Sequence, residues 1–77
     1  RDKTHTFAVL SKDTDLRTGP GKRYPYWVEV SEGAKVLVET KTKEENGYTA
    51  VTTEAGITGY VPTDRLTQKK EGTWEFD

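Results

Sequence analysis

Glycine, proline and asparagine divide this chain into short runs of β-prone residues, and no window carries a sustained helical repeat of apolar side chains. The 77 residues are enough for one small domain. We therefore predict an all-β domain of about five short antiparallel strands. The predicted strands are residues 7–10, 26–30, 35–40, 48–53 and 57–61.

Turn signals connect the later strands of this prediction. Gly33 ends the turn that follows residue 30, and glycine tolerates the positive φ that such a position requires. Asn46-Gly47 is a strong hairpin signal and predicts antiparallel pairing of residues 35–40 with 48–53. Gly56 closes a further hairpin. Consecutive hairpins form a meander, and a meander can remove its free edges by curling, so we expect a small barrel.

The end of the domain is predicted from Pro62, which has no N–H to donate to a strand ladder. Residues 63–66 suit a short 3-10 turn before the last strand, with Thr63 or Asp64 as its cap. The domain then covers residues 6–67, and residues 68–77 are a polar linker or C-terminal tail, with an added strand as the alternative. Trp74 and Phe76 fall on one face there. They belong either to a tail that serves a neighbouring domain or to an added strand that docks onto the barrel.

Residue types needed for catalysis are scarce in this sequence. His5 is the only histidine and lies in an N-terminal segment that we expect to fray, and the chain has no cysteine. One histidine and scattered carboxylates are a poor donor set for zinc, which prefers nitrogen and sulfur ligands. Glu44 and Glu45 fall in a predicted turn, where they are interpreted as solvated charges. We therefore predict a protein that is not an enzyme and uses neither a cofactor nor a metal.

The charge balance bears on possible partners. Twelve basic and thirteen acidic residues give a formal net charge of -1. Such a chain lacks the broad positive field that attracts proteins to nucleic acid, so no nucleic-acid partner is expected. No apolar run approaches the roughly 20 residues that span a bilayer, so we expect no membrane insertion by this segment.

Three segments resemble one family pattern. Residues 16–24 read Leu-Arg-Thr-Gly-Pro-Gly-Lys-Arg-Tyr, residues 30–38 lead from a Gly turn into a Val-Leu-Val run, and residues 46–66 join Asn-Gly-Tyr to a closing Gly-Tyr-Val-Pro-Thr-Asp-Arg-Leu. Together these segments resemble the bacterial Src-homology-3-like (SH3-like) domains of envelope proteins. The resemblance covers residues 15–66 and implies a small SH3-like barrel.

The chain departs from that family pattern at its aromatic positions and in its first loop. Tyr48 and Tyr60 stand where the family commonly has Trp, so an aromatic surface is kept with a smaller area. Eukaryotic SH3 domains share the Gly-Tyr-Val-Pro ending but carry an acidic loop, whereas residues 19–23 are basic here. Arg65 also stands where the eukaryotic pattern has a groove-lining Tyr. Recognition of proline-rich PxxP peptides is therefore disfavoured.

The first loop also has a meaning that does not depend on family. Gly19 and Gly21 flank Pro20, so the chain can reverse sharply there, and we predict a positive φ at both glycines. A Gly-rich phosphate cradle is the disfavoured alternative, because no helix follows to supply an N-terminal dipole. Arg17 is expected to pair with an acidic neighbour and stiffen the loop, with ligand contact as the alternative.

The aromatic residues are the remaining candidates for function. Trp27 and Tyr60 are interpreted first as packing residues, with ligand contact as the alternative. If Val51 points into the core, Tyr48 points to the opposite face unless a bulge intervenes. The resemblance places Tyr24, Tyr48 and Pro62 on the groove side of an SH3-like fold, flanked by basic side chains. The candidate ligand-binding residues are Tyr24, Tyr48, Pro62, Arg65, Lys22 and Arg23.

The resemblance implies a non-catalytic targeting module of a bacterial envelope protein, located in the periplasm, in the cell wall or outside the cell. The implied ligand is peptidoglycan or its stem peptides, and a neighbouring catalytic domain would explain such a module. A basic and aromatic groove suits an anionic, partly apolar ligand, whose carboxylate Arg65 can hold through two parallel hydrogen bonds. The alternative is a protein-protein interaction domain in a larger signalling, secretion or phage assembly.

Overall fold

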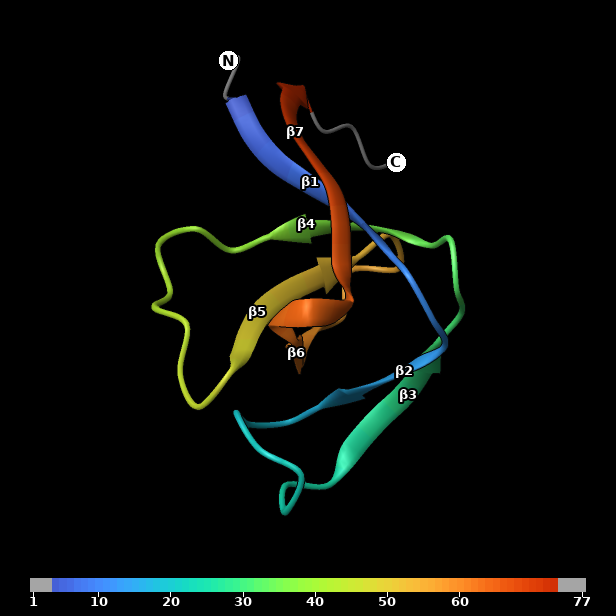
Figure 1. The fold of residues 1–77 in the computed structure, drawn as a ribbon, viewed down its shortest axis with the longest axis vertical. Coiled ribbons are helices and arrows are strands. Elements are labelled where there is room, and N and C mark those ends of the chain that lie inside the picture. The colour runs from blue at the N-terminus through green and yellow to red at the C-terminus, as the bar shows by residue number, and fades with distance from the viewer. Residues whose placement is uncertain (1–3, 74–77) are drawn as a thin grey trace.

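The computed structural model describes residues 4–73, which form seven strands and one short 3-10 turn, η1 (Figure 1). The strands pair antiparallel in one sheet with the order β3-β2-β6-β5-β4-β1-β7. No helix in these residues is long and apolar enough to cross a membrane. The elements are β1 (Thr4–Leu10), β2 (Thr14–Arg17), β3 (Tyr26–Val30), β4 (Lys35–Val38), β5 (Tyr48–Thr53), β6 (Thr58–Pro62), η1 (Thr63–Arg65) and β7 (Leu66–Thr73).

The all-β prediction is confirmed, and the strand number and the closure of the sheet differ from the prediction. Seven strands are present rather than about five, and the sheet is not closed into a barrel, since β3 and β7 lie at its two edges. The additional strands are β2, which is not predicted from sequence, and β7. Residues 68–73, for which the sequence leaves a polar linker, a tail or an added strand open, lie in β7 and pair with β1. The predictions for Trp74 and Phe76 fall outside the described residues.

The other strand bounds lie close to those predicted. The ranges 26–30 and 48–53 agree with β3 and β5, and β6 is displaced by one residue from the predicted 57–61. β4 ends at Val38, two residues before the predicted end at residue 40. β1 begins at Thr4, so His5 lies in a strand opposite Gly72 instead of in a frayed end.

The turns adopt the conformations that their glycines predict, but they do not all close hairpins. Asn46 and Gly47 have φ of 57° and 79° and separate the bridged pair Glu45 and Tyr48, as expected of a two-residue hairpin turn. Gly33 and Gly56 also have positive φ. Gly56 joins the paired strands β5 and β6, whereas Gly33 joins β3 to β4, which are not neighbours in the sheet. The meander is therefore limited to β4, β5 and β6.

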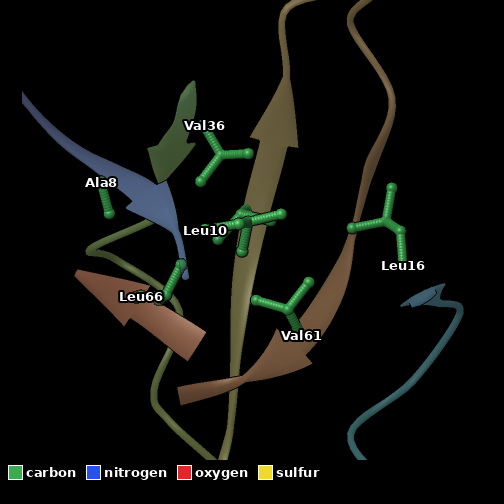
Figure 2. Close-up of a cluster of buried hydrophobic side chains, with 7 residues drawn as sticks. Ala8, Leu10, Leu16, Val36, Val61 and Leu66 are labelled. Atoms are coloured by element: carbon green, nitrogen blue, oxygen red, sulfur yellow. The ribbon is translucent and has the colours of Figure 1, made fainter. Parts of the chain in front are cut away.

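One apolar core draws side chains from nearly every strand (Figure 2). Since one sheet supplies all of these buried residues, it must curve around them. Gly59 allows the close approach of β2 and β6, because a Cβ there would lie 2.6 Å from Leu16 Cγ. The core residues are Ala8 and Leu10 of β1, Leu16 of β2, Val36 of β4, Val51 of β5, Val61 of β6 and Leu66 of β7.

The turn η1 is held differently from the prediction. Its N-cap is Pro62, and no side chain caps it, so neither Thr63 nor Asp64 has the predicted capping role. The Thr63 hydroxyl instead shares a 2.7 Å hydrogen bond with the Thr49 hydroxyl, and the Thr63 N–H donates to the Gly47 carbonyl at 2.8 Å. These bonds attach η1 to the beginning of β5, which brings Pro62 and Arg65 toward Tyr48.

Candidate functional site

The loop between β2 and β3 folds around the ring of Tyr24. A Cβ at Gly19 would lie 2.5 Å from Tyr24 Cδ1, a distance that real Cβ atoms do not tolerate, so the glycine is required for space. The prediction of positive φ at Gly19 and Gly21 is wrong, since the positive-φ glycines of the described residues are Gly33, Gly47 and Gly56. The loop reverses instead through a hydrogen bond from the Gly21 N–H to the Gly19 carbonyl at 2.9 Å.

The side chain of Arg17 stabilises this loop through hydrogen bonds to its backbone. Its Nη1 donates to the carbonyl of Tyr24 at 2.8 Å and to the carbonyl of Lys22 at 3.1 Å, while Nη2 lies 3.5 Å from Asp15 Oδ2. The expected pairing with an acidic neighbour is confirmed. Because one planar guanidinium engages two carbonyls and a carboxylate, it sets the path of residues 22–24.

A second loop, residues 39–47, is tied to the first through Asn46. The Asn46 Nδ2 donates to the Pro20 carbonyl at 3.1 Å, and this contact joins positions 26 residues apart. From the sequence, Asn46 is predicted only as a turn residue. Asn46 has a positive φ in the turn, and its side chain contacts the first loop, so one residue both forms the hairpin turn and connects the two loops.

The first hollow lies between the β2–β3 hairpin and η1 and has a volume of about 250 Å³. Tyr48 and Pro62, which lie opposite each other in the β5–β6 register, form its aromatic and apolar part. Tyr48 is only 7% exposed, so it offers the hollow a limited face of its ring. The lining residues are Asp13, Thr14, Asp15, Arg17, Lys22, Glu29, Tyr48, Pro62 and Arg65.

The second hollow lies between the two loops, has a volume of about 540 Å³ and shares Lys22 with the first. The guanidinium carbon of Arg23 lies 5.5 Å from the centroid of the Tyr24 ring, within the range of a cation-π contact. Its lining residues are Pro20, Gly21, Lys22, Arg23, Tyr24, Glu45 and Asn46. We refer to the two hollows together as the groove. All six candidate residues line it.

The groove carries both signs of charge. The first hollow contains the basic Arg17, Lys22 and Arg65. Three acidic residues that are not predicted to belong to the site lie beside them: Asp13, Asp15 and Glu29. Asp13 Oδ1 accepts a 2.8 Å hydrogen bond from the Glu32 N–H, and Asp15 pairs with Arg17. In residues 4–73, the side chains of Lys22 and Arg65 have no ion-pair partner. The groove is predicted from the sequence to be basic, but its first hollow contains three acidic residues as well as three basic ones.

The aromatic residues outside the groove do not all pack as expected. Trp27 is 58% exposed, so its interpretation as a packing residue is wrong. Leu16 lies opposite Val28 while Arg17 lies opposite Tyr26, which leaves Trp27 as the extra residue of a β-bulge. Tyr60 is half-buried and lies opposite Ala50 on one side and Arg17 on the other.

Comparisons with known proteins do not assign this chain to a family. No protein-family model, curated protein or solved structure matches the sequence or the fold.

Proposed function

We propose that this chain is a non-catalytic binding module of SH3-like type, whose groove takes an extended peptide. The connectivity supports this proposal: a β5–β6 hairpin is followed by η1, and β7 then returns to pair with β1. The β2–β3 hairpin comes between β1 and β4 in the chain, pairs with β6 through β2, and carries the loop that forms one wall of the groove.

The observation that carries the proposal is the convergence of the six candidate residues. Lys22, Arg23 and Tyr24 come from the first loop, Tyr48 from the beginning of β5, and Pro62 and Arg65 from the η1 region. These segments are far apart in sequence, yet they line two hollows that share Lys22. Concave surfaces with aromatic walls and a few polar groups are typical of ligand sites.

The ligand that fits best is peptidic and carries charges of both signs. Lys22 and Arg65 suit carboxylates, since ammonium and guanidinium groups form charge-assisted hydrogen bonds with carboxylates, and Glu29 in the same hollow suits an amine. Tyr24, Tyr48 and Pro62 supply apolar contact for small side chains. Peptidoglycan stem peptides combine carboxylates, an amine and small aliphatic side chains. We therefore infer a targeting role in a bacterial envelope protein, in the periplasm, the cell wall or outside the cell.

The affinity of such a groove is modest. Two open hollows on a domain of 77 residues support dissociation constants in the micromolar to millimolar range, about -8 to -4 kcal/mol. Binding of this strength becomes useful when a tethered partner domain raises the effective concentration.

Co-sedimentation with purified peptidoglycan sacculi tests this function. The parent chain is expected in the pellet at low salt, and Lys22→Ala combined with Arg65→Ala is expected to remain in the supernatant. Lys69→Ala is the matched control, because Lys69 is an exposed cation on β7 and does not line the groove. Each variant is first checked by circular dichroism for an unchanged fold.

The opposite pattern would overturn the proposal. A parent chain that stays in the supernatant does not bind the wall. Equal retention of the folded double variant and the parent places the binding surface elsewhere.

A further inference from the structure

The edge strand β3 exposes a continuous apolar stretch. Tyr26, Trp27 and Val28 are 55%, 58% and 38% exposed, and they are the large exposed hydrophobic residues of the described chain. β3 pairs only with β2, so its other side presents unpaired backbone N–H and C=O groups. An edge with apolar side chains and free backbone groups is a template for another strand.

The opposite edge of the sheet provides an internal comparison. β7 carries the exposed charged residues Lys69, Lys70 and Glu71, and Gln68 has a φ of 53° that interrupts its regular course. Charged side chains and local irregularity are the usual protection of an edge strand. β3 contains neither Lys nor Pro, its one charged residue is Glu29, and its one irregularity, the bulge at Trp27, leaves the indole exposed. The β3 edge is therefore less protected than the β7 edge.

A third, apolar hollow adjoins β3. It has a volume of about 410 Å³ and lies between β3, the turn before β4, and the β5–β6 turn. Val28 and Val30 of β3 form one side of it, and Ala55 and Ile57 form the other. An added strand along β3 places its alternate side chains over this hollow.

The charges around β3 favour one orientation of an added strand. Lys22 and Arg23 precede β3, whereas Glu29 and Glu32 lie in its last part and in the turn after it. Two copies of this edge in antiparallel orientation bring the basic end of one beside the acidic end of the other. A parallel arrangement brings like charges together, which is unfavourable.

We propose that β3 is the interface through which a second copy of this chain associates, antiparallel and about a two-fold axis near Val28. In this register Tyr26 faces Val30 of the other copy, and Trp27 faces Glu29. Such an interface is self-complementary, as a two-fold requires. The proposal does not require the ligand proposed for the groove, since it rests on the exposed edge, the unequal protection of the two edges and the charge pattern. The two surfaces adjoin, because Lys22, Arg23 and Glu29 also line the groove.

The dimer is expected to be weak. A single strand edge on a domain of this size buries less than the roughly 1,200 Å² that stable specific interfaces bury in total. Association is therefore expected at concentrations of about 10 μM to 1 mM.

Sedimentation equilibrium of the whole chain over that concentration range measures the association. The parent is expected to approach a monomer-dimer equilibrium, and Trp27→Lys is expected to weaken it at least about tenfold, because a lysine protects the edge and an aromatic anchor is lost. Thr40→Lys adds the same charge at an exposed position outside β3 and is expected to leave the equilibrium unchanged.

A charge exchange tests the orientation. Arg23→Glu and Glu32→Lys are each expected to weaken self-association, since each puts like charges at both ends of the two-fold interface. An equimolar mixture of these two variants restores opposite charges at both ends, so the mixture is expected to associate more strongly than either variant alone. Because both positions are exposed, each variant retains its fold.

Three results overturn the proposal. A parent chain that remains monomeric at about 1 mM excludes the second copy as the occupant of this edge. A dimer that Trp27→Lys leaves intact, or a mixture of charge variants that gains nothing, shows that association uses another surface or another orientation.

Discussion

At the scale of single residues, Gly19 shows how one position can be required for a reason other than backbone conformation. Its φ is not positive, yet the Tyr24 ring occupies the space that a side chain would need. The glycine at position 19 is therefore needed for a close contact between the backbone and the Tyr24 ring, and this contact shapes one wall of the groove.

Gly19→Ala is predicted to destabilise the fold by about 1–3 kcal/mol, because the new methyl group overlaps the Tyr24 ring and forces it to move. Urea unfolding measures the change. Gly21→Ala is the matched control: a Cβ there meets its nearest atom, Asn46 Nδ2, at 3.4 Å, so a cost below about 0.5 kcal/mol is expected. Equal costs at the two positions would contradict the steric explanation.

Arg17→Lys is predicted to cost about 1–2 kcal/mol of stability, because an ammonium group cannot reproduce the two hydrogen bonds from one guanidinium to the Lys22 and Tyr24 carbonyls. Urea unfolding gives the cost, and amide exchange at residues 22–24 should become faster. Arg23→Lys, at an exposed arginine beside the Tyr24 ring, should change stability by less than about 0.5 kcal/mol. A fully stable Arg17→Lys variant with unchanged exchange contradicts this role.

At the scale of elements, local signals predict the strands that carry clear β-prone runs. β3 and β5 combine aromatic and β-branched residues between turn signals, and their bounds follow from the sequence. β7 reads Leu-Thr-Gln-Lys-Lys-Glu-Gly-Thr, which has no such run. It is a strand because its backbone pairs with β1. Pairing with a distant segment therefore outweighs the low β propensity of its own residues.

The acidic residues of the groove are not predicted from the sequence, because the strand β2 is not predicted either. Its four residues, Thr-Asp-Leu-Arg, are too few and too mixed to stand out as a strand. Only its pairing with β3 places Asp15 opposite Glu29, and that pairing includes a bulge that a strict two-residue alternation does not reveal. The same bulge places Trp27 in solvent, where composition alone predicts a core residue.

At the scale of the whole molecule, the arrangement of the sheet is predicted less well than the approach of the candidate residues to one another. The resemblance stated from the sequence predicts that residues 22–24, 48, 62 and 65 lie on one side, and these residues line the two adjoining hollows. The strand order depends instead on non-local pairings, such as that of β2 with β6 through Arg17 and Tyr60, for which no local signal exists. The β4–β5–β6 meander is predicted because short turns alone determine it.

The most direct test of the central claim is an NMR titration of the ¹⁵N-labelled chain with a soluble peptidoglycan stem peptide. The amide signals of Lys22, Tyr24, Tyr48 and Arg65 are predicted to shift together and to saturate with one dissociation constant in the micromolar to millimolar range. The signals of Lys69 and Lys70 on β7 should not move. A spectrum that is unchanged at millimolar peptide, or shifts confined to residues outside the groove, contradicts the assignment of this groove as the ligand site.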